Sequence, residues 1–370
     1  MARNIEERLS SLRTRRKGAD RLAVLTADSM ALESYQRKMY LQEAWEQRAR
    51  GEPYTKYALG AMQEVDPDYT RISMQAADRV ANQLGKRISG FNLEFRLQGS
   101  VPLNVHIRGV SDVDLLTLID QQFLSYDPTG IRSNTYWPSS ATSLEQLTQL
   151  RQEEEPALRN AFPAATVDTS GSKAIKISGG SLARSVDVVP SHWYDSADYQ
   201  RVGDLPDRGV IILDRKANRT VTNFPFKHIK LVSDRDVIAA GGLRKAIRLC
   251  KNVKADSDRN IALPSFDIAA IMFHADQAAL RMGVFHELAI LAETQRHLDH
   301  LYHHPEEAKR LDVPDGTRRI FDTDTKLNAL LSLSCEMDEL SKAVAGEHRL
   351  LGSEPSNESA RQVLKEVRVQ

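Results

Sequence analysis

Segments that favour β-strands occupy one block of the chain, and segments with helical periodicity lie on both sides of it. The block begins at Phe91–Leu97, where apolar and polar residues alternate, and continues at Val113–Ile119, which is rich in β-forming residues. A helical segment, Ser143–Phe162, follows and is ended by Pro163. Further strand-like segments are Ala164–Asp168, Lys173–Ile177, Ser185–Val189 and Val210–Asp214. The pattern predicts an α+β fold built on a mixed β-sheet.

The regions that flank this block are predicted to be helical. Residues 4–51 carry charges of both signs and few Gly or Pro residues, which favours helices with solvated outer faces. After Phe226, helices are expected at 244–254, 265–274, 278–302 and 324–347. We therefore predict a core with N-terminal helices at 1–225, a helical C-terminal lobe at 226–352 and a flexible polar tail at 353–370.

The charge balance restricts the classes of partner. Fifty Lys and Arg residues match fifty Asp and Glu residues, so the protein is not a polycation that binds long nucleic acid by neutralising phosphates. The balanced total does not exclude a local basic face. Two cysteines, Cys250 and Cys335, are too few for a disulfide framework or a four-cysteine zinc site. Met1–Arg16 has no apolar stretch typical of a signal or anchor. We expect a cytoplasmic protein without membrane association.

Three aspartates lie within the strand-forming segments. Asp112 and Asp114 are two residues apart, so their side chains share one face of a strand. Asp187 lies between apolar neighbours in a later segment. Carboxylate and phosphate oxygens are the ligands that Mg²⁺ prefers, whereas carboxylates gathered without a cation raise one another's pKa values. The three acids therefore predict a pair of metal ions, provided that they converge.

A single Asp-x-Asp pair is most often an exposed strand face, and a Gly-Ser pair is most often a plain turn. Here Asp114 and Asp187 are flanked by apolar β-formers, and ionised acids are costly to bury unless they are paired or bind a metal. Gly99 and Ser100 directly follow the first strand, where backbone N–H groups and a hydroxyl could approach a phosphate closely. The acids and the turn together favour a phosphate-handling site.

The order of these elements resembles the DNA polymerase beta-like nucleotidyltransferase superfamily: a strand, a Gly-Ser turn, an Asp-x-Asp strand and a later strand with one Asp. That resemblance implies that Asp112 and Asp114 bind both metal ions. It also implies that Asp187 completes the site of the ion nearest the acceptor hydroxyl.

The downstream half carries a basic stripe and a second helix start. Arg244, Arg248 and Lys251 follow at helical spacing beside an apolar seam, and such a stripe could face a triphosphate. Ser265 and Phe266 open the next helix, where Ser265 is expected to act as the N-cap and exposed N–H groups favour an anion.

This helix pair resembles the bacterial CD-NTases and their animal relatives, cyclic GMP-AMP synthase and oligoadenylate synthetase, over roughly residues 91–273. The resemblance implies that Ser100 contacts the donor triphosphate and that Lys251 and Ser265 hold its β- and γ-phosphates. Phe266 stands where the family commonly has a tyrosine that stacks on a base, so the ring is kept and the hydroxyl is lost. From the residues alone, Lys251 could also be a solvated helix lysine, Ser265 only a cap, and Phe266 part of the core.

Four histidines, His297, His300, His303 and His304, lie near one helix end. Only some of them share a face, and no cysteine or carboxylate completes a tetrahedral set, so we interpret them as a surface cluster rather than a structural metal site. The animal DNA sensor of this family has a zinc-binding thumb and broad basic surfaces. The lack of both features predicts that double-stranded DNA does not activate this protein.

The resemblance implies a two-lobed enzyme that binds nucleoside triphosphates between its lobes, with ATP expected among them. A ribose hydroxyl of one nucleotide would attack the α-phosphate of another, assisted by two Mg²⁺ ions, with Mn²⁺ as the other candidate metal. A second round in the same site would give a cyclic di- or oligonucleotide, a second messenger of anti-phage signalling in bacteria. The polar tail is a candidate docking site for a regulatory protein.

Two other functions stay open. A template-independent transferase that extends RNA 3′ ends would use the same fold, but it needs an extended basic surface that the balanced charge does not favour. A catalytically idle nucleotide-binding scaffold is the second alternative. The presence of all three acids and of the Gly-Ser turn argues against it.

Overall fold

The computed structural model describes residues 4–17, 43–349 and 355–369, and the chain divides into two compact units. The sheet unit comprises Pro67–Leu103 and Asp112–Leu231, and the helical unit comprises Met1–Asp66, Asn104–Ser111 and Val232–Gln370. Residues 18–42 of the predicted N-terminal helices lie outside the described residues.

The sheet unit contains the strands and three of the described helices. Its strands are β1 (Leu93–Gln98), β2 (Val113–Ile119), β3 (Ser125–Tyr126), β4 (Thr166–Asp168), β5 (Ile175–Ser178), β6 (Val186–Asp195), β7 (Arg208–Asp214) and β8 (Arg219–Asn223). Its helices are α6 (Pro67–Arg87), α7 (Ser143–Ala161) and α8 (Ala197–Val202). The predicted strands and the helix predicted at 143–162 are confirmed, and β3 and β8 are additional.

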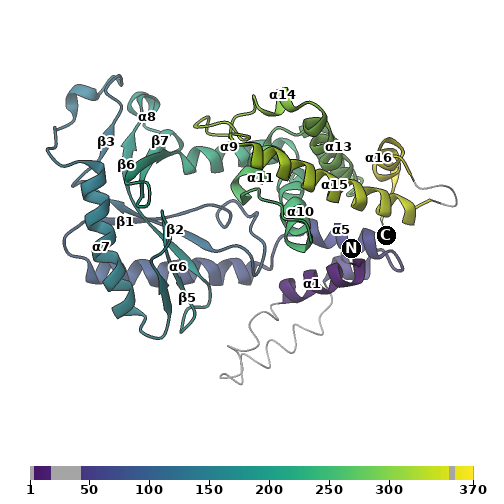
Figure 1. Cartoon of the computed structure of the whole chain (residues 1–370), viewed down its shortest axis with the longest axis horizontal. Helices are drawn as coiled ribbons and strands as arrows, with labels where there is room; N and C mark the ends of the chain where they lie inside the picture. Colours follow the sequence, from purple (N-terminus) through teal and green to yellow (C-terminus); the bar gives the residue numbers. More distant parts are fainter. Residues whose placement is uncertain (1–3, 18–42, 350–354, 370) are drawn as a thin grey trace. The chain divides into compact units, whose positions relative to one another are not determined.

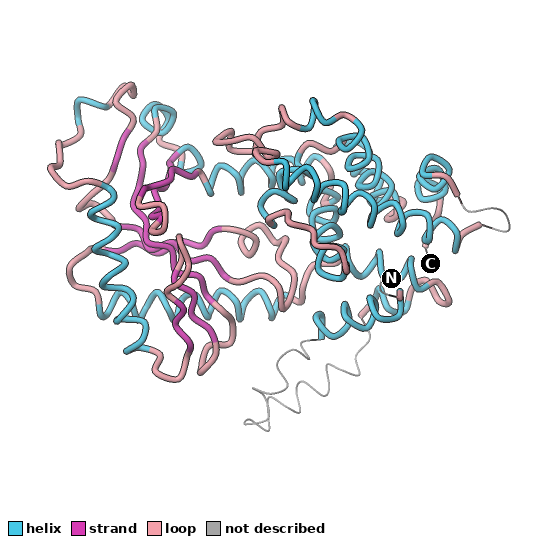
Figure 2. The backbone as a smooth tube through the Cα atoms, viewed as in Figure 1, coloured by secondary structure: helices cyan, strands magenta, loops and turns pink. Residues whose placement is uncertain are grey.

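The strands form one mixed sheet with β6 near its centre (Figure 2). One edge of β6 pairs parallel with β2 and then with β3, and the other edge pairs antiparallel with β5 and then with β7. β1 pairs with β2, β4 with β5, and β8 with β7. The predicted mixed sheet is therefore confirmed, and its only parallel pairs in the described chain involve β6.

Helices α6 and α7 cover one face of the sheet (Figure 1). α6 buries Ala76, Val80 and Leu84 at helical spacing against the strands. α7 begins with a capping box between Thr142 and Glu145, which satisfies backbone N–H groups at its first turn. The apolar side chains of β2 and β6 that point to this face complete the core under α6 and α7. The residues at the alternate positions of these two strands point to the opposite face of the sheet.

The helical unit contains α1 (Ile5–Lys17), α4 (Ala44–Gln47), α5 (Pro53–Met62), α10 (Gly242–Asp256), α11 (Ser265–Phe273), α12 (Gln277–Arg281), α13 (Ala289–His303), α14 (Pro305–Ala308), α15 (Asp324–Glu347) and α16 (Asn357–Glu366). Helix α9 (Pro225–Ile238) begins in the sheet unit and ends in the helical unit. Among the described helices, none combines the length and the apolar character needed to cross a membrane.

Three features differ from the sequence expectations. The single helix expected at 278–302 is divided into α12 and α13, and between them Gly283 lies so close to Ile290 that a Cβ at this glycine would approach the Ile290 side chain to 2.5 Å. The tail expected to be flexible contains α16, which buries Ala360 and Leu364 and packs against α13 and α15. Residues 4–17 and 43–66 group with the C-terminal helices, whereas the expected core at 1–225 placed them with the sheet.

A buried acid lies inside the core between α7 and the sheet. Glu154 on α7 is fully buried. Burial raises the pKa of Glu154 to about 8, against the opposing effects of the Thr117 hydroxyl and the Arg151 guanidinium. The side chain is therefore largely protonated at neutral pH.

Replacing Glu154 by Gln should flatten the dependence of stability on pH. The folded-state pKa lies above the unfolded value, so the stabilising contribution of the protonated acid is complete below about pH 4.5 and is lost as the pH rises through about 8. Urea denaturation should show wild-type stability for Glu154→Gln near pH 5 and a gain of roughly 3–4 kcal/mol near pH 8. The half-buried neighbour Glu153→Gln is the control; a wild-type pH slope in Glu154→Gln would contradict the assignment.

Candidate active site

The strand register brings residues from four strands into one row across the sheet. Gln98 on β1 pairs with Asp114 on β2, Asp114 pairs with Asp187 on β6, and Asp187 pairs with Lys176 on β5. Residues that pair directly across strands point to the same face. The row lies on the face opposite α6 and α7, because Val113 and its partner Val186 belong to the core on the helix side. The predicted convergence of Asp114 and Asp187 is therefore present within the sheet unit.

Asp112 extends this row toward the start of β2. It lies two residues before Asp114, and its Oδ2 accepts a hydrogen bond from the Lys176 ammonium at 2.5 Å. Burial acts to lower the pKa of Lys176, but the hydrogen bond to Asp112 and the charges of Asp112 and Asp187 raise it overall. Lys176 therefore stays charged and is the cation that accompanies the three acids.

Asp187 lies in a largely buried environment on β6. Its flanking residues Val186 and Val188 are fully buried, which holds the aspartate rigidly on the strand. Burial, followed by the negative charge of Asp112, raises the pKa of Asp187 to about 6. Its Oδ1 is buried and has no hydrogen-bond partner among the described residues. A buried carboxylate oxygen of this kind is suited to a ligand that supplies positive charge or a proton.

The Gly-Ser turn directly follows β1 and approaches the acid row. Gly99 has a φ of +77°, and a Cβ at this position would lie 2.2 Å from Asp114 Oδ2. Only glycine leaves room for the aspartate and adopts this conformation without strain. Ser100 follows in the turn with a half-buried side chain. Gly99 and Asp114 therefore depend on each other sterically.

The three acids fit a hard divalent cation by the type of their donor atoms, which are carboxylate oxygens. The unpartnered Oδ1 of Asp187 supports this fit. Over residues 4–17, 43–349 and 355–369, however, no three His, Cys, Asp or Glu side chains are arranged so that they could hold a metal ion, and Asp112 is engaged by Lys176. Binding at Asp112, Asp114 and Asp187 therefore requires side-chain rearrangement, and the metal assignment stays a prediction.

In the helical unit, the basic residues of α10 bind the protein's own groups. The Lys251 ammonium is buried and donates to Val105 O at 2.8 Å and to Ser111 Oγ at 3.3 Å. Arg248 is also buried and donates to Met62 O and Asn104 O at 2.8 and 2.7 Å. The expected phosphate-facing stripe is thus occupied by contacts to backbone oxygens and to a hydroxyl.

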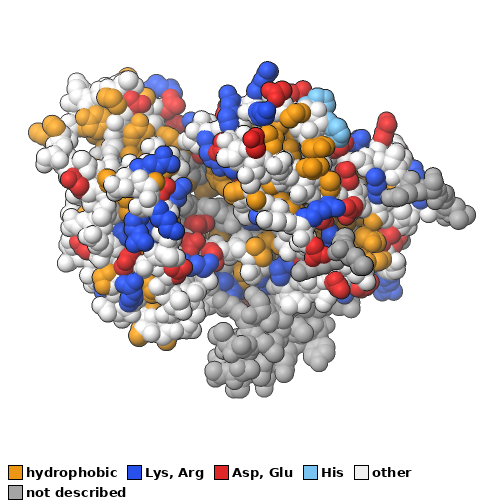
Figure 3. Space-filling view, in the orientation of Figure 1, with side chains coloured by type: hydrophobic (Ala, Val, Ile, Leu, Met, Phe, Trp, Pro, Cys, Tyr) orange, Lys and Arg blue, Asp and Glu red, His pale blue; other side chains and the backbone are white. Residues whose placement is uncertain are grey.

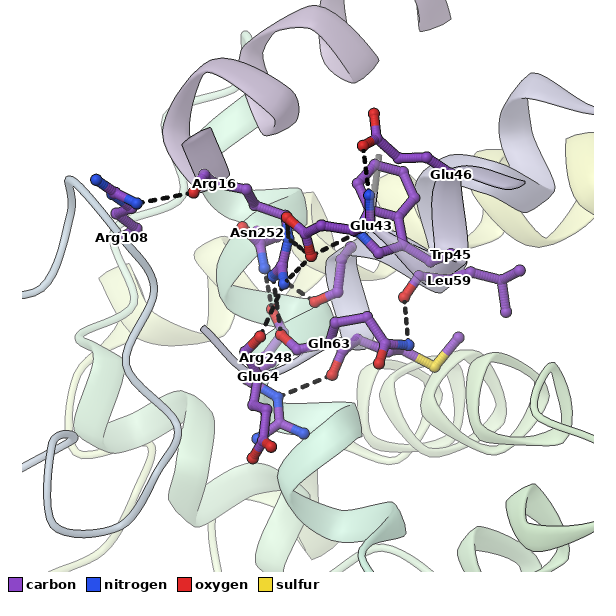
Figure 4. Close-up of polar contacts among 12 residues, drawn as sticks. Arg16, Glu43, Trp45, Glu46, Leu59, Gln63, Glu64, Arg108, Arg248 and Asn252 are labelled. Carbon is purple, nitrogen blue, oxygen red and sulfur yellow. Dashed lines mark hydrogen bonds and ion pairs between the residues drawn. The ribbon is translucent and has the colours of Figure 1, made fainter. Parts of the chain in front are cut away.

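These contacts anchor Asn104–Ser111, the segment that leads into Asp112. Figure 4 shows Arg248 near the labelled Glu64, and Arg108 donating to the carbonyl oxygen of Arg16 at 2.9 Å. Burial lowers the pKa of Arg248 to about 10, so the guanidinium remains charged at neutral pH. The amphipathic pattern of α10 correctly predicted which residues form its polar stripe. Nothing in that pattern indicated that the stripe would bind residues 104–111.

Ser265 and Phe266 are placed as exposed residues at the start of α11. Pro264 is the N-cap, and Ser265 is the first helical residue, so the expectation that Ser265 caps the helix is wrong. The Phe266 side chain is 37% exposed and the Arg318 guanidinium lies 5.5 Å from the centre of its ring, which excludes the core alternative. Both residues can therefore reach a ligand from the helical unit.

The histidines form a surface cluster with one exception. His300 stacks on His304, and His303 contacts Asp299, while histidine side chains are visible at the surface in Figure 3. His297 is instead buried, with Nε2 2.9 Å from Ile271 O, and burial lowers its pKa to about 4. The surface interpretation is therefore wrong for this one histidine, whose place on the inner side of α13 puts it in the core.

The charge distribution and the cysteines agree with the sequence analysis. On the face shown in Figure 3, Lys and Arg side chains lie among Asp and Glu side chains. Cys250 and Cys335 are both free thiols, and burial raises the pKa of Cys250 to about 12. Neither thiol is therefore poised to act as a nucleophile.

Replacing Gly99 by Ala should test the close approach to Asp114. Gly179 has nearly the same φ, +76°, but a Cβ there would meet nothing within 4 Å, so Gly179→Ala carries the backbone cost alone. We expect Gly179→Ala to lower the free energy of unfolding by about 1 kcal/mol and Gly99→Ala by roughly 2–3 kcal/mol. Urea denaturation measures both, and equal losses would contradict the steric dependence of Gly99 on Asp114.

Several known proteins are similar to this chain in sequence and in fold. A cyclic dinucleotide synthase CdnE from Yersinia aleksiciae is 44% identical over 339 residues, 88% of each chain. A c-di-GMP synthase from Capnocytophaga granulosa is 34% identical over 291 residues, 72% of this chain and 80% of the relative. The solved structure of a STING-associated CdnE c-di-GMP synthase from Capnocytophaga granulosa has a TM-score of 0.69 at 26% identity, covering 91% of this chain and 97% of that one.

The fold is also shared with the Rhodothermus marinus CdnE c-UMP-AMP synthase, with a TM-score of 0.58 at 16% identity over 80% of this chain and 97% of that one. No protein-family model matches the chain. The two curated relatives nevertheless cover most of it at 34% and 44% identity, and they agree with the resemblance carried by the acids and the Gly-Ser turn. The chain therefore belongs to the bacterial CD-NTase family and is a nucleotidyltransferase.

Proposed function

We propose that this nucleotidyltransferase joins two nucleoside triphosphates into a cyclic dinucleotide and releases pyrophosphate. The observation that carries the proposal is the pairing of Asp114 with Asp187 across β2 and β6, with Asp112 on the same face of the sheet. Relatives that are named cyclic dinucleotide synthases support the class of product.

In this proposal Asp112, Asp114 and Asp187 hold two divalent ions, Mg²⁺ or Mn²⁺. Such ions, when bound, stabilise the attacking and leaving oxygens of a phosphoryl transfer. Asp187 would lie nearest the attacking ribose hydroxyl and would help to activate it. Ser100, in the turn beside Asp114, would donate its hydroxyl to the donor triphosphate.

The helical unit would contribute three residues to nucleotide binding. Ser265 is exposed at the start of α11, where the backbone N–H groups of a helix N-terminus favour phosphate. Phe266 offers an exposed ring for stacking on a base. Lys251 would hold phosphate in exchange for its contact with Ser111 Oγ, which at 3.3 Å is longer than its hydrogen bond to Val105 O at 2.8 Å.

The product would act as a second messenger in anti-phage signalling within the cytoplasm. The support comes from the structural relative that is described as a STING-associated CdnE c-di-GMP synthase, because this description links a protein of the family to STING. We expect ATP among the substrates, no requirement for double-stranded DNA, and α16 as the candidate surface for a regulatory protein.

The product can be identified directly. The purified protein should be incubated with ATP, GTP, CTP and UTP and Mg²⁺ in the absence of nucleic acid, and the products analysed by mass spectrometry. A phosphatase-resistant product with the mass of a two-nucleotide ring is expected. Incorporation of nucleotides only when RNA is added would contradict the proposal and favour an RNA 3′-end transferase, and no turnover under either condition would favour an idle scaffold.

The double substitution Asp112→Asn with Asp114→Asn should abolish synthesis without destabilising the fold. Losing both bound ions is expected to lower product formation by about a thousandfold or more. The melting temperature should stay the same or rise, because like charges are removed. Asp168→Asn is a matched control: this acid is exposed on β4 and pairs with Lys176 in the sheet. Wild-type synthesis by the double variant would refute the metal assignment.

A further inference from the structure

Lys176 is a charged residue of the acid row that the proposed chemistry does not use. Its strand places it directly opposite Asp187, yet its ammonium contacts Asp112 Oδ2 at 2.5 Å. The side chains are only partly covered, 44% exposed for Lys176 and 33% for Asp112, so the lysine has room to move away. The contact between Lys176 and Asp112 is therefore partly open to solvent.

The ammonium occupies one of the two carboxylate oxygens that Asp112 offers to a divalent ion. Asp112 offers its Oδ2 to Lys176, and Asp187 adds negative charge that raises the pKa of the lysine. A divalent ion bound by the acids would repel the ammonium at this distance. The lysine and the ion therefore compete for Asp112.

We propose that Lys176 is a built-in counter-cation that holds Asp112 in place when no divalent ion is bound and that leaves Asp112 when an ion binds. This inference rests on the proposed function, which assigns the ion to Asp112, Asp114 and Asp187. Lys176 offsets part of the repulsion among the three acids and so keeps the row ordered before the ion arrives. It is a positioning residue: it acts on a carboxylate and not on the nucleotides.

The proposal predicts opposite effects of one substitution on stability and on metal binding. In EDTA, Lys176→Met should lower the melting temperature, because the acids then repel one another without compensation. With Mg²⁺, the same variant should bind the ion about two- to fivefold more tightly than wild type, as expected for loss of a competing, partly exposed ion pair. A merely structural lysine would lower stability without improving metal binding.

The experiment is a titration of MgCl₂ against nucleotide-free protein, followed by thermal unfolding from an EDTA starting point. Lys173→Met, which removes an exposed lysine just before β5, is the matched control and should follow wild type. Lys176→Arg keeps the positive charge and should bind Mg²⁺ no more tightly than wild type. In an Asp112→Asn background, Lys176→Met should no longer lower the melting temperature in EDTA.

Unchanged or weaker Mg²⁺ binding by Lys176→Met would overturn the proposal, and so would the lack of any Mg²⁺-dependent shift in both the wild-type and the Met variant. If Lys176→Met fails to fold, Lys176→Gln replaces it, with the same expected results. This experiment and the test of the proposed function can give different answers. If Lys176→Met binds Mg²⁺ more tightly than wild type but the wild-type protein makes no cyclic product, the role of Lys176 is supported and cyclic dinucleotide synthesis is refuted.

Discussion

The parallel pairing of β2 with β6 is the constraint on which the candidate site depends. It sets Asp114 opposite Asp187, and because side chains alternate along a strand, a slip by one residue would turn one acid into the core. That slip is prevented on the other face, where Val113 and Val186 are buried under α6 and α7. The apolar core thus fixes the position of the acids, although it does not touch them.

The local pattern of the sequence predicted the strands and the acids, since a period of two residues is visible in any short segment. It could not predict Lys176, because the pairing of β5 with β6 depends on a hairpin whose register no local pattern reveals. The division between α12 and α13 was missed for a related reason. The close approach of Gly283 to Ile290 arises from how the chain turns back, and periodicity alone continues through it.

Charged residues on α10 illustrate a second limit of sequence reasoning. The apolar seam correctly indicated which side of the helix faces the core, but a polar stripe can face solvent, ligand or the protein's own backbone. Arg248 and Lys251 face the protein's own backbone. Each is buried and donates to carbonyl oxygens of segments that are distant in the sequence. Burial of a cation is costly, and the hydrogen bonds to backbone oxygens offset part of that cost.

The segment Asn104–Ser111 also affects how recombination could exchange the sheet unit between related proteins. The sheet unit is made of two stretches of chain, and the residues between them belong to the helical unit. A recombination that swaps the sheet of one synthase for that of another therefore carries along a loop that was matched to a foreign α10. Arg248 and Lys251 recognise that loop mostly through main-chain carbonyl oxygens, which every sequence possesses. Such a junction tolerates divergence of the loop's side chains, as long as its length and path are kept.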